Sequence, residues 1–260
     1  MRIQRLSLLL TGLVLGLSAC ETQYNAALHH QETLMYSDDK ERNLGASVAA
    51  SVEKEMKIDT EVDVNERMRA ILKRIVDVSD RKDLIYTIRV IDEDVMNAFS
   101  LPGGYIYMYK GLIDKLKTDD QIAGVIGHEV AHVVAKHALK RLQAAYGATI
   151  LEGAAVVSGQ GEVAAATNLT AASLFFINSR EDEFQADRLG VKYMKLAGYD
   201  ASQMKIVLAK LLEESTKKGP QLKSYWRSHP YIPLRIAKVD SEVQGAMQFK
   251  DYLNLTGEER

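Results

Sequence analysis

The sequence predicts an α+β fold that is predominantly helical, with a small β-sheet beside an apolar helix that carries two histidines. Several stretches repeat apolar residues at spacings of three and four, the period of an amphipathic helix. Two stretches alternate between apolar and polar residues, the period of a strand. The chain of 260 residues has four prolines and lacks a Gly/Ser-rich spacer, so its length and composition favour one domain with a substantial core.

The N-terminus resembles the signal of a bacterial lipoprotein. Arg2 and Arg5 precede an apolar stretch from Leu6 to Leu17, which is too short to span a membrane, and small residues lead to Cys20. We therefore expect a lipoprotein signal peptide over residues 1–19, a lipidated N-terminal tether over residues 20–37 with Cys20 as the lipidated residue, and the main domain over residues 38–260. The alternative is an ordinary signal peptide with a cysteine that follows it by chance.

Charge and cysteine content limit the partners. Loss of residues 1–19 removes two arginines and no acid, which takes the net charge from −2 to −4, so no electrostatic argument favours nucleic acid. No later run of 18 apolar residues exists, so we expect membrane contact through the lipid anchor. Because Cys20 is the single cysteine, an internal disulfide is impossible, and a metal must be held by His, Asp or Glu.

The main domain begins with two predicted helices and two predicted strands. The apolar positions of the helices are Leu44, Val48, Val52 and Met56 in the first, and Val64, Met68, Ile71, Leu72 and Ile75 in the second. The predicted strands cover residues 84–91 and 105–110, and a turn at residues 102–104 precedes the second strand.

Three later segments are interpreted from composition and periodicity. Residues 147–178 are rich in small residues and predict two helices, which form either packed core or a mobile cover beside a cleft. A further amphipathic helix is expected after Asp200, with its apolar residues at Met204, Val207, Leu208, Leu211 and Leu212. The basic stretch 216–228, which contains Trp226, is expected to be a solvated loop.

The pair His128 and His132 carries the first functional argument. Thr118 and Gln121 have the spacing of a capping box, which predicts a helix from there to about residue 145. Positions four apart lie on one face of a helix, so the two imidazoles could hold one zinc ion. Glu129 is then placed to take a proton from a water on the metal. The alternative is a core helix whose histidines only form hydrogen bonds with their neighbours.

A third metal ligand has to come from elsewhere in the chain. His137 would lie about 140° around a continuous helix from His132, so we expect it to be exposed or to lie behind the ligands. On a helix that starts near Ser179, Glu183 and Asp187 are again four apart and share one face. One of these carboxylates could bind the metal while the other accepts a hydrogen bond from a ligating histidine.

Four motifs, in this order along the chain, resemble the zinc metallopeptidase family of HtpX, BepA and the CAAX prenyl endopeptidase. They are Asn97-Ala98-Phe99 with Leu101-Pro102-Gly103-Gly104-Tyr105-Ile106-Tyr107, the His-Glu-x-x-His helix, Ser179-Arg180-x-x-Glu183-x-x-Ala186-Asp187, and Ser228-His229-Pro230 with Arg235-Ile236. The match covers roughly residues 38–245. The small residues before Cys20 resemble the lipobox of bacterial lipoproteins, which points within the family to periplasmic lipoprotein members similar to LoiP.

The resemblance implies a zincin-like fold of the gluzincin type, with one Zn²⁺ per chain. The implied zinc ligands are His128, His132 and Glu183. It also implies that Glu129 is the general base and that Asp187 supports a ligand histidine.

For His229 the resemblance leaves alternatives open. The side chain stabilises the oxyanion, or it occupies the open position of the zinc and holds the enzyme inactive; a capping or core histidine is the third interpretation. The substrate is expected to be an extended polypeptide that joins the sheet edge near Gly103, Gly104 and Tyr105 through main-chain hydrogen bonds.

Binding of that kind suits unfolded or misassembled proteins of the cell envelope or outer membrane. We therefore expect a membrane-anchored zinc endopeptidase in the bacterial cell envelope, facing the periplasm and held on either the inner or the outer membrane. The alternative is a zinc-bound holdase or assembly factor for envelope proteins, with gated or weak proteolysis.

Overall fold

The computed structural model describes residues 21–144, 178–217 and 228–245. The predicted signal peptide with Cys20, most of the small-residue segment and the greater part of the basic stretch with Trp226 lie outside the described residues. Within the described ranges, no helix combines the length and apolar character needed to cross a membrane.

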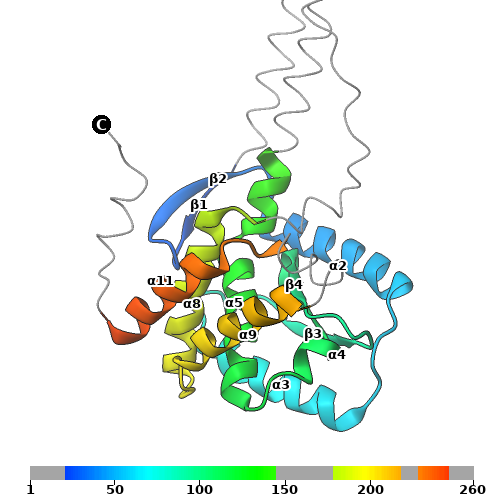
Figure 1. Cartoon of the computed structure of the whole chain (residues 1–260). Coiled ribbons are helices and arrows are strands. Elements are labelled where there is room, and N and C mark those ends of the chain that lie inside the picture. The colour runs from blue at the N-terminus through cyan, green and yellow to red at the C-terminus, as the bar shows by residue number, and fades with distance from the viewer. Residues whose placement is uncertain (1–20, 145–177, 218–227, 246–260) are drawn as a thin grey trace, which may run out of the picture.

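Helix α5 (Asp119–Val134) runs through the middle of the helical layer (Figure 1). It packs most extensively against α8 (Arg180–Leu196), and also against α3 (Val62–Val76) and α9 (Gln203–Lys217). Helix α11 (Ile232–Gln244) lies on α8 and α9, and the short α4 (Lys110–Ile113) follows the last strand. The predicted α+β fold with predominant helices is confirmed.

A three-stranded sheet lies beside α5. It comprises β3 (Thr87–Ile91), β4 (Ala98–Leu101) and β5 (Tyr105–Tyr109) in the order β3-β5-β4. Strand β5 is parallel to β3 and antiparallel to β4, to which it is joined through the turn η1 (Pro102–Gly104). The two predicted strands are confirmed as β3 and β5, although β3 begins only at Thr87. Strand β4 was not predicted from the sequence.

The two faces of the sheet contact different helices. Ile88, Ile106 and Met108 belong to the core formed with α3, α5, α8 and α9. Phe99 and Tyr107 belong to a second core, together with residues of α2 (Asp38–Glu55). The alternation predicted for β5 therefore places its tyrosines toward α2 and its aliphatic residues toward the helix with the two histidines.

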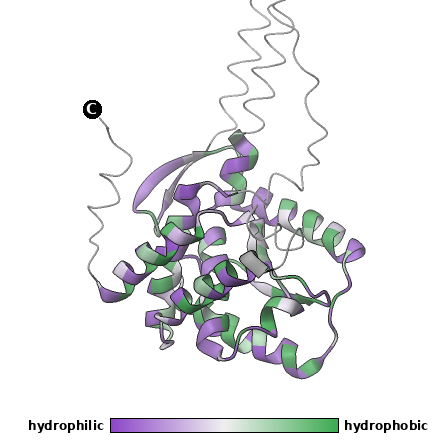
Figure 2. Cartoon of the chain, in the orientation of Figure 1, coloured by the Kyte–Doolittle hydropathy of each residue, from purple (hydrophilic) through white to green (hydrophobic). Residues whose placement is uncertain are grey.

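The predicted amphipathic helices are present. Along α2 and α3, hydrophilic and hydrophobic positions alternate in Figure 2, and the α3 stripe is buried at Met68, Ile71, Leu72 and Ile75. In α2, Val52 is buried as predicted, whereas Leu44 and Val48 are half-buried and the neighbouring Gly45 and Ala49 are buried.

Residues 21–34 of the predicted tether over residues 20–37 are folded. These residues form a β-hairpin of β1 (Glu21–Asn25) and β2 (His30–Leu34), with Glu21 opposite Leu34. The hairpin turn places Ala27 and Leu28 in the main core, and the Asn25 side chain donates a hydrogen bond to Val134 O at 3.4 Å. A segment with few apolar residues is thereby held against α5 through its turn, which strand periodicity does not reveal.

The histidine helix is not continuous to residue 145 as predicted. It ends at Val134, and residues 137–144 form a separate helical stretch after a turn at Ala135 and Lys136. Lys136 has φ +56°, a left-handed conformation that costs about 1–3 kcal/mol for a residue other than glycine. The Lys136 ammonium donates hydrogen bonds to Gln23 Oε1 and Asp38 Oδ1, at 2.5 and 2.8 Å, and these contacts hold the turn in place.

Candidate metal centre

Helix α5 presents His128 and His132 on one buried face. Thr118 is its N-cap and accepts a hydrogen bond from Gln121 N at 3.3 Å, as predicted. In a capping box the side chain of Gln121 would accept a hydrogen bond from Thr118 N. Here Gln121 Oε1 accepts from Lys117 N instead, at 2.9 Å. Both histidines are almost fully buried, at 3 and 5% exposure, so they face the interior rather than solvent.

Helix α8 brings the carboxylates to the same place. Ser179 and Asp182 form a complete capping box at its start, which orients the first turn that carries Glu183. The helix approaches α5 closely because two glycines meet: a Cβ on Gly127 would lie 3.3 Å from Gly190 O. At this crossing a larger side chain would hold the carboxylates away from the histidines.

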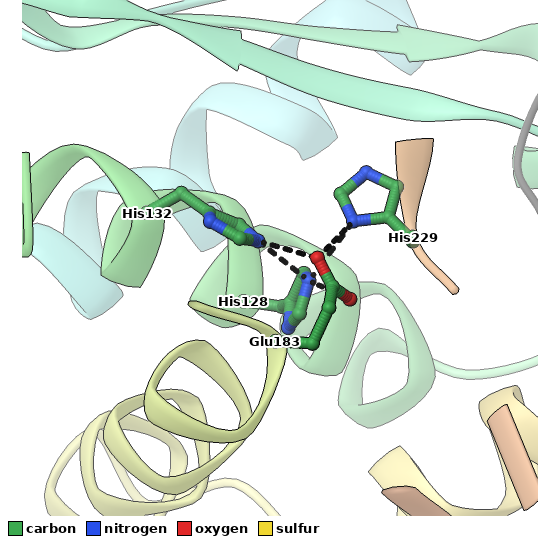
Figure 3. A group of neighbouring side chains, drawn as sticks. All are labelled: His128, His132, Glu183 and His229. Carbon is green, nitrogen blue, oxygen red and sulfur yellow. Dashed lines mark hydrogen bonds and ion pairs between the residues drawn. The ribbon is translucent and has the colours of Figure 1, made fainter. Parts of the chain in front are cut away.

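Four side chains converge on one point, as Figure 3 shows. His132 Nε2 lies 3.0 Å from His128 Nε2 and 3.3 Å from Glu183 Oε1. His229 Nδ1 lies 3.0 Å from Glu183 Oε1 and 3.3 Å from His128 Nε2. Ligand atoms around a tetrahedral zinc lie about 3.3–3.4 Å apart, given bonds of about 2.0–2.1 Å. The four donors therefore fit Zn²⁺ in both type and spacing.

His229 comes from the segment just before α11. Its Nε2 faces Ala98 O at 3.2 Å and Glu129 Oε1 at 3.5 Å, while its Nδ1 faces the other three donors. With the proton on Nε2, His229 donates to the backbone of β4 and directs the Nδ1 lone pair at the cluster. The Nδ1 atom of His229 therefore lies together with the donor atoms of the other three side chains.

A second row of charged groups lies behind the cluster. Asp187 Oδ1 is 2.9 Å from His128 Nδ1, as expected for a carboxylate that orients a ligand histidine. Arg235 donates to both oxygens of Asp187 at 2.7 Å and lies 2.5 Å from Glu183 Oε2. Arg235 is 1% exposed, so a buried guanidinium joins both carboxylates of α8.

These contacts set the pKa values of the site. Burial raises the pKa of Glu183 and of Asp187, but Arg235 and His128, joined at Glu183 by His229, together outweigh it and hold both carboxyls below their usual range. Burial and Arg235 lower the pKa of His128, whereas Glu183 and Asp187 outweigh them and raise it to about 9. Burial lowers the pKa of His132 well below its usual value.

Glu129 lies on the other side of the cluster, toward the sheet. Its Oε2 accepts a hydrogen bond from Ser100 Oγ on β4 at 2.9 Å, and its Oε1 is buried without a hydrogen-bond partner among the described residues. A small cavity lies here, between β4, the end of α5 and residues 136–141. Glu129, His132 and His229 line it.

The predicted substrate contact at Gly103, Gly104 and Tyr105 is not supported by this geometry. Tyr105 begins β5, the central strand, which already pairs on both sides. Gly103 is buried against α2, where its N–H donates to Glu41 Oε1 at 3.2 Å. The outer strand on the side of the metal cluster is β4, one turn earlier in the chain, and its residues line the cavity instead.

Sequence reasoning missed the contacts of two residues near the cluster, Asn178 and Arg235. Asn178 Nδ2 lies 3.4 Å from His132 Nε2 and 3.2 Å from His229 Nδ1. Arg235 belongs to a motif that was recognised but received no role. His137 is buried and lies behind His132, the second of its two predicted positions. The turn at Lys136, which was not predicted, brings the ring of His137 to that position.

A helix with two histidines and a glutamate, completed by a glutamate from a second helix, is the metal site of a zinc metallopeptidase of the gluzincin type. Comparison with known families agrees, since the model of peptidase family M48 matches residues 63–243. The chain belongs to this family, as its motifs predicted.

Curated relatives are similar over part of their length. The mitochondrial metalloendopeptidase OMA1 of Schizosaccharomyces pombe is 30% identical over 179 residues, which cover 65% of this chain and 50% of that protein. The beta-barrel assembly-enhancing protease of Escherichia coli is 27% identical over 163 residues, covering 57% of this chain and 32% of the relative. The putative protease of the same name from Vibrio cholerae is 26% identical over 200 residues, covering 67% and 41%. The chain thus spans half or less of these relatives.

Proposed function

We propose that this protein is a zinc-dependent endopeptidase that hydrolyses peptide bonds of unfolded or misassembled polypeptides. The observation that carries the proposal is the convergence of His128, His132 and Glu183 within hydrogen-bonding distance of one another, next to Glu129 and a cavity. In this assignment the three side chains hold Zn²⁺. When bound, Zn²⁺ supplies Lewis-acid chemistry, lowering the pKa of a water and polarising the scissile carbonyl.

Glu129 is the proton carrier in this assignment. Ser100 Oγ donates to its Oε2 and leaves Oε1 directed toward the cluster. Glu129 accepts the proton of the attacking water and returns it to the amine that leaves when the peptide bond breaks. Its burial keeps bulk water from competing for that proton.

Substrate is proposed to lie along β4 rather than at residues 103–105. Strand β4 is the outer strand beside the cavity, and its residues Phe99, Ser100 and Leu101 line that cavity. An extended peptide on this strand would be bound mainly through its backbone. That mode of binding suits unfolded clients of varied sequence.

The place of action is proposed from the N-terminal sequence and the relatives. The lipobox-like sequence before Cys20 supports a lipid anchor in the bacterial cell envelope, with the enzyme facing the periplasm. The names of two relatives refer to β-barrel assembly, which supports outer-membrane proteins as the client class.

Glu129→Gln tests the catalytic proposal. The amide keeps the shape of the side chain but cannot take the proton, so cleavage of an unfolded protein such as casein should fall by about 10²–10⁴-fold. The zinc content should stay at one ion per chain, measured by elemental analysis. Glu66→Gln, at an exposed position of α3, is the matched control and should leave both values unchanged.

The same experiment separates the holdase alternative. A holdase with bound zinc would prevent aggregation of the unfolded client equally well in wild type and Glu129→Gln, with little cleavage in either protein. Absence of tightly bound zinc from the wild type would contradict both functions.

His229→Ala tests whether His229 is a fourth zinc ligand that occupies the position needed by substrate. If His229 occupies a position that substrate needs, its removal should raise the cleavage rate several-fold and weaken zinc binding. A fall in kcat of about 10²–10³-fold with zinc retained would instead assign His229 to oxyanion stabilisation. His229→Gln, which retains a donor without an imidazole, distinguishes loss of a ligand from loss of a hydrogen bond.

A further inference from the structure

His137 is packed directly behind the ligand His132. The two Nδ1 atoms are 2.8 Å apart, and His137 is 1% exposed. On a continuous helix these side chains would point about 140° apart. The left-handed Lys136 breaks the helix between them and turns His137 back toward the ligand.

The protons of this contact follow from the geometry. His132 Nε2 faces His128 Nε2 and Glu183 Oε1, so a metal bound there takes the Nε2 lone pair. His132 must then carry its proton on Nδ1, and the only His137 atom within reach of that proton is Nδ1, which has to accept.

On the other side of the His137 ring, Nε2 is placed to donate a hydrogen bond. Its Nε2 faces two oxygens of α8, Gln185 Oε1 at 3.2 Å and Asp182 Oδ1 at 3.6 Å. Both are acceptors, so Nε2 carries the proton and Nδ1 keeps its lone pair. A chain of hydrogen bonds therefore runs from His132 through His137 to Gln185, each with one donor and one acceptor.

We propose that His137 is a positioning residue for the metal centre: it accepts the Nδ1 proton of His132 and thereby fixes the tautomer and the ring orientation of that ligand. The inference rests on the proposed zinc site. It gives the two histidines of α5 different supports, since His128 is held by the carboxylate of Asp187 and His132 by a neutral imidazole.

Two substitutions test this role through zinc affinity. His137→Leu removes the acceptor and should weaken zinc binding by about 10–100-fold in competition with a chelator. His137→Asn places an amide oxygen as many bonds from Cβ as Nδ1 and should restore most of that loss. His30→Ala, at an exposed histidine, is the control and should bind zinc like the wild type.

Outcomes that overturn the inference are equally defined. Wild-type zinc affinity in His137→Leu would contradict it, and an equal loss in the Leu and Asn variants would reduce His137 to a packing role. Should His137→Leu fail to fold, Gln185→Leu removes the far end of the chain and should weaken zinc binding in the same direction.

The wild-type protein provides a test without any substitution. Long-range ¹H–¹⁵N NMR of the zinc-loaded chain should show His132 protonated on Nδ1 and His137 protonated on Nε2. A proton on Nδ1 of His137 would contradict the proposal. If the wild type binds no zinc, the proposed function fails together with this inference; zinc binding with the wrong tautomer overturns the inference alone.

Discussion

Arg235 balances the charge of the metal centre. Its guanidinium contacts Asp187 with two hydrogen bonds and Glu183 with an ion pair, all within 2.7 Å. Both carboxylates are fully buried, and a buried charge without a partner is strongly destabilising. Arg235 therefore helps to keep Glu183, the proposed ligand, and Asp187 ionised and in place in the metal-free protein.

Arg235→Met should destabilise the metal-free protein by about 3–5 kcal/mol, because it leaves two buried carboxylates without their cation. The free energy of unfolding is measured by urea denaturation. Arg67→Met is the matched control: Arg67 pairs with Asp119 at 2.7 Å, but both side chains are largely exposed, so the expected loss is about 0–1 kcal/mol. Equal losses in the two variants would contradict the role given to Arg235.

For single residues, the sequence predicts the contacts that depend on local spacing along the chain. His128 and His132 meet because four residues separate them on one helix, and Glu183 and Asp187 meet for the same reason. That these two pairs face each other came from the family resemblance, since nothing local joins two helices. Asn178 and Arg235 act across long distances in the chain, so no periodicity marks them.

At the scale of elements, close helix packing positions the site. Glycines allow α5 and α8 to cross closely. In the same way, Gly45 of α2 allows this helix to approach η1, the turn that follows β4. A Cβ on Gly45 would lie 2.0 Å from Pro102 O, so α2 and η1 are in backbone contact there. The position of β4, which ends at η1, therefore depends on α2.

Gly45→Ala should destabilise the protein by about 1–3 kcal/mol, because the new methyl forces α2 away from η1. Cleavage activity should fall as well, since β4 moves with η1. Thermal unfolding and casein cleavage measure the two effects. Asn43→Ala, at an exposed position of the same helix, should leave both unchanged. A stable, fully active Gly45→Ala protein would show that the contact is not needed.

The elements that sequence reasoning misplaced share a physical cause. The break at Lys136 depends on contacts with Gln23 and Asp38, which lie far away in the sequence. Strand β4 has four residues, too few for a visible alternation, and its absence from the prediction made β5 look like a sheet edge. The N-terminal hairpin is held by its turn and by polar contacts of β2 with Lys140 and Gln143, which strand periodicity does not reveal.

At the scale of the whole molecule, the metal centre connects separate parts of the chain. Its donors come from α5, from α8 and from the segment before α11. Zinc that binds the folded protein stabilises it by mass action. It must also displace protons, because a metal binds the neutral imidazole.

Zinc affinity should rise with pH. In the metal-free protein the pKa of His128 is raised from 6.5 to about 9, so one proton competes with zinc below that pH. The apparent Kd should fall by about tenfold per pH unit up to pH 9 and then level off. Burial keeps the pKa of His132 low, so this histidine adds no proton in that range.

The stability of the metal-free protein should fall as the pH rises. A folded pKa above the unfolded value stabilises the protein fully below pH 6.5, and the stabilisation is lost as the pH rises through about 9. Thermal unfolding with and without EDTA across this range measures both trends. A zinc affinity that does not change between pH 6.5 and 9 would contradict the protonation assigned to His128.

Anomalous diffraction at the zinc edge, from crystals of the zinc-loaded wild type, tests the central claim most directly. We expect one ion per chain, with Nε2 of His128 and of His132 at about 2.0–2.1 Å and a Glu183 oxygen at about 2.0–2.2 Å. A chain that binds no ion at this cluster, or an ion held without Glu183, would contradict the account.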